Sequence, residues 1–180
     1  MTQDVLSRLL AEHDWLMADG ATGTTLFNMG LTSGEAPELW NVDKPDNIRA
    51  LYRGAVEAGS DIFLTNSFGG TASRLKLHDA HTRVGELNRL AAELGREVAD
   101  SAGRPVVVAG WMGPTGEIME PMGPLSFEGA VEMFHGQAEA LKAGGVDVLW
   151  VETISAPDEY KAAGRAAELA GMPWVGTMSF

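Results

Sequence analysis

Two acidic residues, Asp19 and Glu152, each directly follow a short apolar run. An unpaired carboxylate in apolar surroundings costs several kcal/mol, so each residue needs a cationic partner. In a functional site that partner would be the ammonium group of a ligand or a metal ion. In a purely structural role it would be a neighbouring Arg or Lys, and Asp19 could instead be a helix N-cap. We interpret the two residues as an acidic corner that accepts an amine. Acid–base catalysis by the pair stays open, because their sequence separation does not give their distance.

Two glycine-containing loops could bind or cover a ligand. In the first, residues 19–24 (Asp-Gly-Ala-Thr-Gly-Thr), Gly20 and Gly23 let backbone amide groups approach a ligand closely. This loop lacks the final Gly-Lys-Ser/Thr of a phosphate-binding loop and is no dinucleotide fingerprint, so we do not expect phosphate binding. The second loop, residues 113–124, is rich in Gly, Pro and Met. It is either an irregular turn or an adaptable apolar cover over a substrate.

Histidine and cysteine add no catalytic or metal site. His78 and His81 stand three apart in a polar stretch that we interpret as a solvated loop or helix start, and His135 lies beside an apolar helical stripe as a structural residue. No Ser-His-Asp arrangement can be argued from the sequence. The chain has no cysteine, which excludes disulfides, thiolate metal ligands and cysteine nucleophiles within it.

The charge balance disfavours two classes of partner. The 180 residues carry a formal net charge of −12 and a sequence pI near 4.6. Such a chain repels phosphate backbones and anionic lipid, so we expect neither nucleic acid nor a membrane as partner. No segment approaches the roughly 20 apolar residues of a membrane span, and the first residues lack the pattern of a signal peptide. A cytoplasmic location is therefore the default expectation.

Short apolar runs alternate with helical stripes along the chain. Continuous runs of this kind are typical of parallel strands that are covered on both faces, and they predict strands at 15–18, 61–65, 105–109, 147–152 and 173–178. Stripes at helical spacing, several with Pro or Asp at the start and Gly at the end, predict helices near 3–12, 45–59, 84–103, 127–144 and 157–171. The alternation predicts parallel βα units in one domain, with polar loops at the carboxyl ends of the strands, where β/α barrels carry their chemistry.

Four motifs follow one another along the chain: residues 19–24, the Ala-Gly-Ser-Asp-Ile stretch at 58–62 that leads to Thr-Asn-Ser-Phe at 65–68, Met-Gly-Pro-Thr-Gly at 112–116 and Glu-Thr-Ile at 152–154. Taken in this order, they resemble the homocysteine S-methyltransferase family. The resemblance covers residues 16–180 and implies an α/β fold of the (β/α)8 TIM-barrel type, with about the first five β/α units in this chain. It also implies zinc as the cofactor that binds and activates the homocysteine thiolate.

The resemblance also assigns roles to residues. It implies that seven positions bind substrate: Asp19, Gly20, Ala21, Thr65, Asn66, Met112 and Glu152. The first three would hold the amino-acid end of homocysteine, Glu152 would bind its ammonium group, Thr65 and Asn66 would line the pocket, and the segment from Met112 would face the methyl donor. Betaine, S-methylmethionine and methyl-cobalamin all fit the family as donors.

This chain departs from the family pattern in two respects. The zinc of the family is held by three cysteines on the late strands, and this chain has none; Trp111 stands where a small residue is more usual. We therefore expect an N-terminal part of a methyltransferase that makes methionine from homocysteine, inactive as this chain alone. The first alternative is a non-catalytic half-barrel that assembles with itself or with a complementary subunit. The second is a zinc-free β/α enzyme that uses Asp19 and Glu152 on another substrate.

Overall fold

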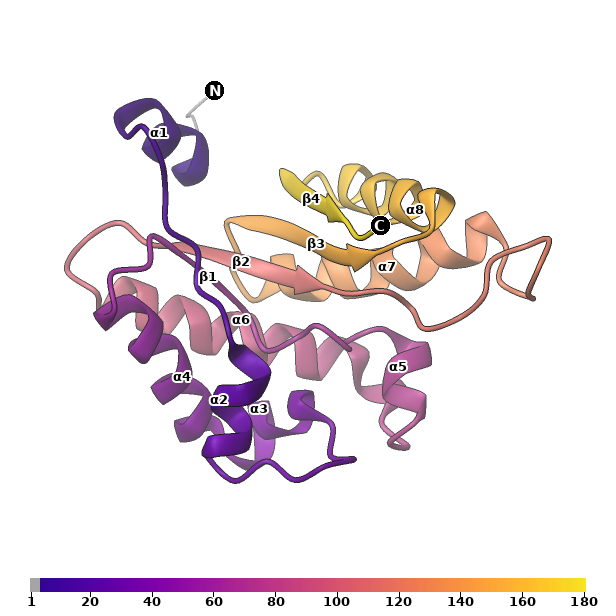
Figure 1. Cartoon of the computed structure of the whole chain (residues 1–180), viewed down its shortest axis with the longest axis horizontal. Helices are drawn as coiled ribbons and strands as arrows, with labels where there is room; N and C mark the ends of the chain where they lie inside the picture. Colours follow the sequence, from indigo (N-terminus) through magenta and orange to yellow (C-terminus); the bar gives the residue numbers. More distant parts are fainter. Residues whose placement is uncertain (1–3) are drawn as a thin grey trace.

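Four parallel strands form the centre of the computed structural model, which describes residues 4–180 (Figure 1). The strands lie side by side in chain order: β1 (Ile62–Leu64), β2 (Val107–Met112), β3 (Val148–Ile154) and β4 (Trp174–Met178). All three pairings are parallel, so a connection with a helix must return the chain to the same end of the sheet each time. The carboxyl ends of the strands therefore meet at one edge.

The helices begin and end where the local sequence supplies suitable residues. Asp4 accepts a hydrogen bond from the backbone N–H of Ser7 (2.8 Å), and Pro45 occupies a first-turn position that needs no donor. The α-helices are α1 (Val5–Glu12), α2 (Thr22–Asn28), α3 (Trp40–Asp43), α4 (Pro45–Glu57), α5 (Ala72–Lys76), α6 (Val84–Asp100), α7 (Phe127–Ala143) and α8 (Pro157–Leu169), and the 3-10 turns are η1 (Pro37–Leu39) and η2 (His81–Arg83). Gly59 and Gly145, at φ 101° and 94°, follow α4 and α7 in a conformation that favours glycine.

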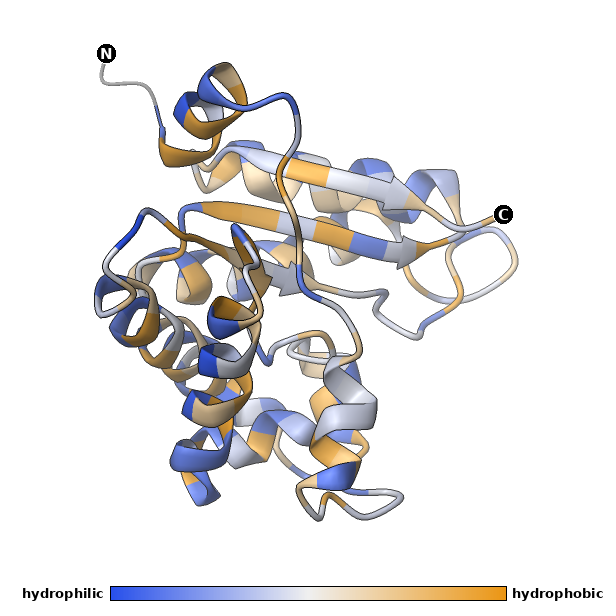
Figure 2. Ribbon diagram, turned by 60° about the vertical axis from the view of Figure 1, so that its left-hand side comes forward, coloured by the Kyte–Doolittle hydropathy of each residue, from blue (hydrophilic) through white to orange (hydrophobic). Residues whose placement is uncertain are grey.

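The sheet separates two apolar clusters. The larger cluster lies between the strands and the helices α4, α6, α7 and α8, and includes Phe63, Phe134 and Leu149. The smaller cluster lies on the other face, where Leu6 and Leu9 of α1 pack with strand residues (Figure 1). Figure 2 shows the apolar colouring on the strands and on the inward faces of the helices. No helix of the described segment combines the length and the apolar character needed to cross a bilayer.

Two strand predictions needed correction. The predicted strand at 15–18 is only a single parallel bridge between Ala18 and Ile62. The Asp61 side chain accepts a hydrogen bond from the N–H of Met17 (2.9 Å), while Met17 O accepts from the N–H groups of both Asp61 and Ile62. A side-chain acceptor and a shared carbonyl oxygen therefore replace a regular ladder. The second correction is the length of β2, which was predicted to end at residue 109 but continues to Met112 through pairing with β3. The helices predicted at 45–59, 84–103, 127–144 and 157–171 are present as α4, α6, α7 and α8. The helix predicted at 3–12 is present as α1, and its residue 3 lies outside the described residues.

Candidate functional site

An acidic cavity of about 440 Å³ lies at the carboxyl ends of the strands. It is lined by ten residues from the first loop, β1, β2 and β3: Ala18, Asp19, Gly20, Ala21, Thr22, Leu64, Trp111, Trp150, Glu152 and Thr153. Asp19 and Glu152, which are 133 positions apart in sequence, therefore share one cavity, as the interpretation of an acidic corner requires. This edge of a parallel sheet is where loops of different units converge on a ligand.

Asp19 is fixed by the neighbouring strand. Its Oδ1 accepts a hydrogen bond from the backbone N–H of Leu64 (3.1 Å), and its own N–H donates to Ile62 O (2.9 Å). Burial raises the pKa of the Asp19 carboxyl to about 7, the Leu64 N–H opposes this shift, and the charge of Glu152 adds to it. The carboxyl group therefore titrates near neutral pH and is available to a cation.

Glu152 lies beside an irregularity in β3. The register of β3 on β4 shifts between Val151 and Ile154, and Thr153 between them has φ 65°. A β-branched residue rarely adopts this conformation, and bulges of this kind redirect side chains next to binding sites. Ala21, which precedes α2 at φ 58°, is a second residue with left-handed backbone on the same cavity. Strain on two sides of one cavity is typical of a functional site.

The other substrate positions predicted from the sequence lie in four different places. Gly20 and Ala21 line the acidic cavity with Asp19. Thr65 is fully buried, and its Oγ1 accepts from the backbone N–H of Trp111 (3.1 Å). Asn66 lines a second cavity, described below. Met112 is fully buried in the larger apolar cluster, because the extension of β2 turns it to the face opposite Trp111.

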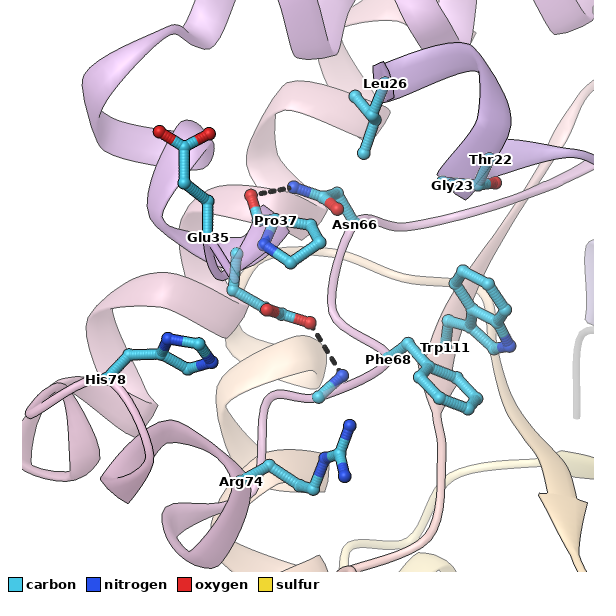
Figure 3. A pocket seen from close by; sticks show the side chains of 12 residues that line it. Thr22, Gly23, Leu26, Glu35, Pro37, Asn66, Phe68, Arg74, His78 and Trp111 are labelled. Carbon is cyan, nitrogen blue, oxygen red and sulfur yellow. Dashed lines mark hydrogen bonds between the residues drawn. The ribbon is translucent and has the colours of Figure 1, made fainter. Parts of the chain in front are cut away.

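The second cavity, of about 240 Å³, adjoins the acidic one (Figure 3). We call it the aromatic cavity, because Phe68 and Trp111 stand together on one side with ring centroids 4.7 Å apart. Its lining is Thr22, Gly23, Leu26, Glu35, Pro37, Glu38, Asn66, Phe68, Gly69, Arg74, His78 and Trp111. Thr22 and Trp111 line both cavities, so the two are adjacent compartments of one site.

Charged groups lie at the far end of the aromatic cavity. The Glu38 carboxylate is buried and accepts a hydrogen bond from the N–H of Gly69 (2.7 Å) (Figure 3). Burial raises the pKa of Glu38, while the Gly69 N–H and the charges of Arg74 and His78 oppose that shift. Arg74 makes no ion pair within 4.0 Å with any residue in the described segment. Glu38 was not predicted from the sequence, and His78 was interpreted as part of a solvated segment, because no local pattern marks either residue as part of a cavity.

The side chains of this chain do not fit the zinc that the resemblance implies. Between residues 4 and 180 no group of three or more His, Cys, Asp or Glu could hold a metal ion, and the sequence has no cysteine to bind zinc as thiolate. His135 pairs with Glu139 on α7 (3.6 Å), away from the strand ends.

The fold is that of a parallel α/β protein, with two adjoining cavities at the carboxyl ends of its strands, one of them lined by two carboxylates. The chain belongs to the homocysteine S-methyltransferase family, whose sequence model matches residues 16–180.

Known proteins of this kind are similar over most of the chain. The methionine synthase of Mycobacterium tuberculosis (strain ATCC 25618 / H37Rv) is 31% identical over 169 residues, 89% of this chain and 14% of that protein. The methionine synthase of Mycobacterium leprae (strain TN) is 30% identical over 157 residues, 82% of this chain and 13% of that protein. The solved homocysteine methyltransferase MmuM from Escherichia coli, in its metallated form, is 25% identical with a TM-score of 0.81, over 98% of this chain and 66% of that chain. The chain thus spans a small part of the methionine synthases and about two thirds of MmuM.

Proposed function

We propose that this protein takes part in methyl transfer to the sulfur of homocysteine, with methionine as the product. The observation that carries the proposal is the shared acidic cavity of Asp19 and Glu152 in a chain of this family. An ammonium group placed between two carboxylates gains charge-assisted hydrogen bonds to both, and the neighbouring Gly20 and Ala21 leave room for the amino-acid backbone. The cavity would thus bind the amino-acid end of homocysteine and direct its sulfur outward.

The aromatic cavity would hold the methyl donor. A positively charged methyl-bearing group is attracted to the faces of aromatic rings such as Phe68 and Trp111. Arg74, which has no ion pair among residues 4–180, would bind a carboxylate on the same molecule. A volume of about 240 Å³ suits small onium compounds such as betaine or S-methylmethionine, whereas methyl-cobalamin would have to approach from outside. In the transfer, the thiolate sulfur forms a bond to the methyl carbon, and the electron pair of the broken bond leaves with the donor.

We further propose that the four-stranded sheet belongs to a (β/α)8 barrel of which 1–180 is the N-terminal portion, as the family resemblance implies. Zinc dependence would then need ligands from beyond residues 1–180, because residues 4–180 offer no fitting set and the sequence has no cysteine. Assembly with a second copy or a complementary subunit stays a prediction, which sedimentation velocity over a range of concentrations tests.

Titration calorimetry with L-homocysteine tests the proposed function. We expect binding of L-homocysteine and at least tenfold weaker binding of 4-mercaptobutanoate, which has the same thiol and carboxylate but no amine. The Glu152→Gln variant should lose most of this difference, because it removes one charge from the cavity. Equal affinity of the wild-type chain for both compounds would contradict the proposal.

A further inference from the structure

The indole of Trp111 holds the carboxylate of Glu152. Its Nε1–H donates a hydrogen bond to Glu152 Oε2 at 2.7 Å, and both side chains are half-buried on the acidic cavity. The register of the sheet produces this contact: Trp111 on β2 pairs with Trp150 on β3, and Glu152 stands two residues further on the same face of β3. A bond from an uncharged donor to a carboxylate at this distance is a strong one.

Trp111 is itself fixed from three sides. Its backbone N–H donates to Thr65 Oγ1 (3.1 Å), and its carbonyl oxygen accepts from Ser67 Oγ (2.8 Å). The two hydroxyl groups also bond to each other (2.7 Å). The indole packs against Phe68, with ring centroids 4.7 Å apart. The donor is therefore rigid, and the mobile partner in the pair is the Glu152 side chain, which has more rotatable bonds.

Glu152 needs such a restraint. It makes no ion pair within 4.0 Å, and its carboxylate has no hydrogen bond other than that from Trp111, among residues 4–180. Its charge lies near enough to Asp19 to disfavour ionisation there, so the two carboxylates repel each other. In an empty cavity this repulsion would turn the Glu152 side chain out toward solvent.

We propose that Trp111 is a positioning residue of the acidic cavity, whose indole N–H keeps the Glu152 carboxylate facing Asp19 so that an ammonium group finds both charges in place. This inference rests on the proposed function for the identity of the ligand, but the positioning itself concerns only the protein. Trp111 also lines the aromatic cavity, so the residue that orients the amine-binding carboxylate is a wall of the neighbouring compartment.

The test measures the titration of Asp19 by carbon-13 NMR of its carboxyl group in the ligand-free chain. The variants are Trp111→Phe and the chain with 3-benzothienylalanine at position 111, which keeps the shape of the indole but has no N–H. We expect both to lower the pKa of Asp19, as Glu152→Gln should, because a released Glu152 carboxylate moves away from Asp19. 3-Benzothienylalanine at position 150 is the matched control: the Trp150 indole lines the same cavity, but its N–H has no hydrogen-bond partner in the described part of the chain, so losing that N–H while the ring keeps its bulk should leave the Asp19 titration unchanged. The other groups coupled to Asp19 are the Leu64 N–H and the Tyr52 hydroxyl, and no variant alters them.

Binding of L-homocysteine gives the second readout. We expect about tenfold weaker binding when position 111 lacks the N–H, the effect of losing one hydrogen bond to a charged group in a partly buried site. An Asp19 titration that is the same with and without the N–H at position 111 would overturn the inference, as would unchanged affinity. If the wild-type chain fails to bind homocysteine, the proposed function falls, while the Asp19 titration still decides the role of Trp111.

Discussion

The acidic cavity holds a different charge at pH 6 and at pH 8, because Asp19 titrates between these values. With a pKa of about 7, the Asp19 carboxyl group is ionised in about 9% of molecules at pH 6 and about 91% at pH 8. An ammonium ligand prefers the ionised form, so its affinity should rise with pH, by about tenfold over this interval, if binding requires that form. L-methionine is a suitable ligand, since it has no thiol that titrates in the same range.

Calorimetry in two buffers of different ionisation enthalpy measures both the affinity and the proton release. At pH 6 we expect binding of L-methionine to release close to one proton from Asp19, and at pH 8 close to none. The Asp19→Asn variant should bind more weakly at pH 8 and show no pH dependence from this group. A wild-type affinity that is flat or falls between pH 6 and pH 8 would refute the reasoning.

The same titration affects the ligand-free fold. Between pH 4 and pH 7 the folded chain keeps a proton on Asp19 that the unfolded chain has already lost, so the free energy of unfolding falls as pH rises through this window. Asp19→Asn should remove this part of the pH dependence, because the amide does not titrate while its oxygen can still accept from the N–H of Leu64. Urea unfolding at pH 5 and pH 8 measures the difference, and identical pH dependence in the two proteins would count against a raised pKa of Asp19.

Three further predictions concern the segments around the two cavities. Thr153→Gly relieves a backbone at φ 65° and should raise the free energy of unfolding in urea by up to about 1 kcal/mol; a loss would mean that the threonine side chain has an unseen stabilising role. Glu159 Oε1 accepts hydrogen bonds from the N–H (2.8 Å) and the hydroxyl (2.6 Å) of Thr115, so Glu159→Ala should lower the free energy of unfolding by about 2–4 kcal/mol in the same assay. Glu159→Gln keeps an acceptor oxygen and should cost under about 1 kcal/mol; equal losses in the two variants would argue against these hydrogen bonds. Gly113→Ala places a Cβ atom against the ring of Phe68 and should lower the free energy of unfolding by about 1–3 kcal/mol, measured by thermal unfolding. The near-ultraviolet circular dichroism should change as the ring moves; an unchanged spectrum would show that the ring has room to adjust.

Much of the fold could be predicted from local sequence. Helical stripes bounded by Pro, Asp and Gly gave α4, α6, α7 and α8, because caps and apolar periodicity are local properties. Apolar runs between these helices predicted parallel strands, and the acidic residues at their ends predicted that Asp19 and Glu152 would meet. In a parallel sheet the carboxyl ends lie at one edge, and the Ala18–Ile62 bridge holds Asp19 at that edge although residues 15–18 form no full strand.

The tertiary structure decided where the strands stop and which way their side chains point. The Gly-Trp-Met segment at 110–112 has the composition of a loop, and only pairing with β3 makes it part of β2. Because strand side chains alternate, that pairing buries Met112 in the core and turns Trp111 to the acidic cavity, beside Glu152. The aromatic cavity likewise depends on Glu38, Phe68 and Arg74, which come from separate elements and carry no shared local signal. Local periodicity thus determined the elements of this protein, while long-range pairing determined the site, since no residue-to-residue register is encoded within a single segment.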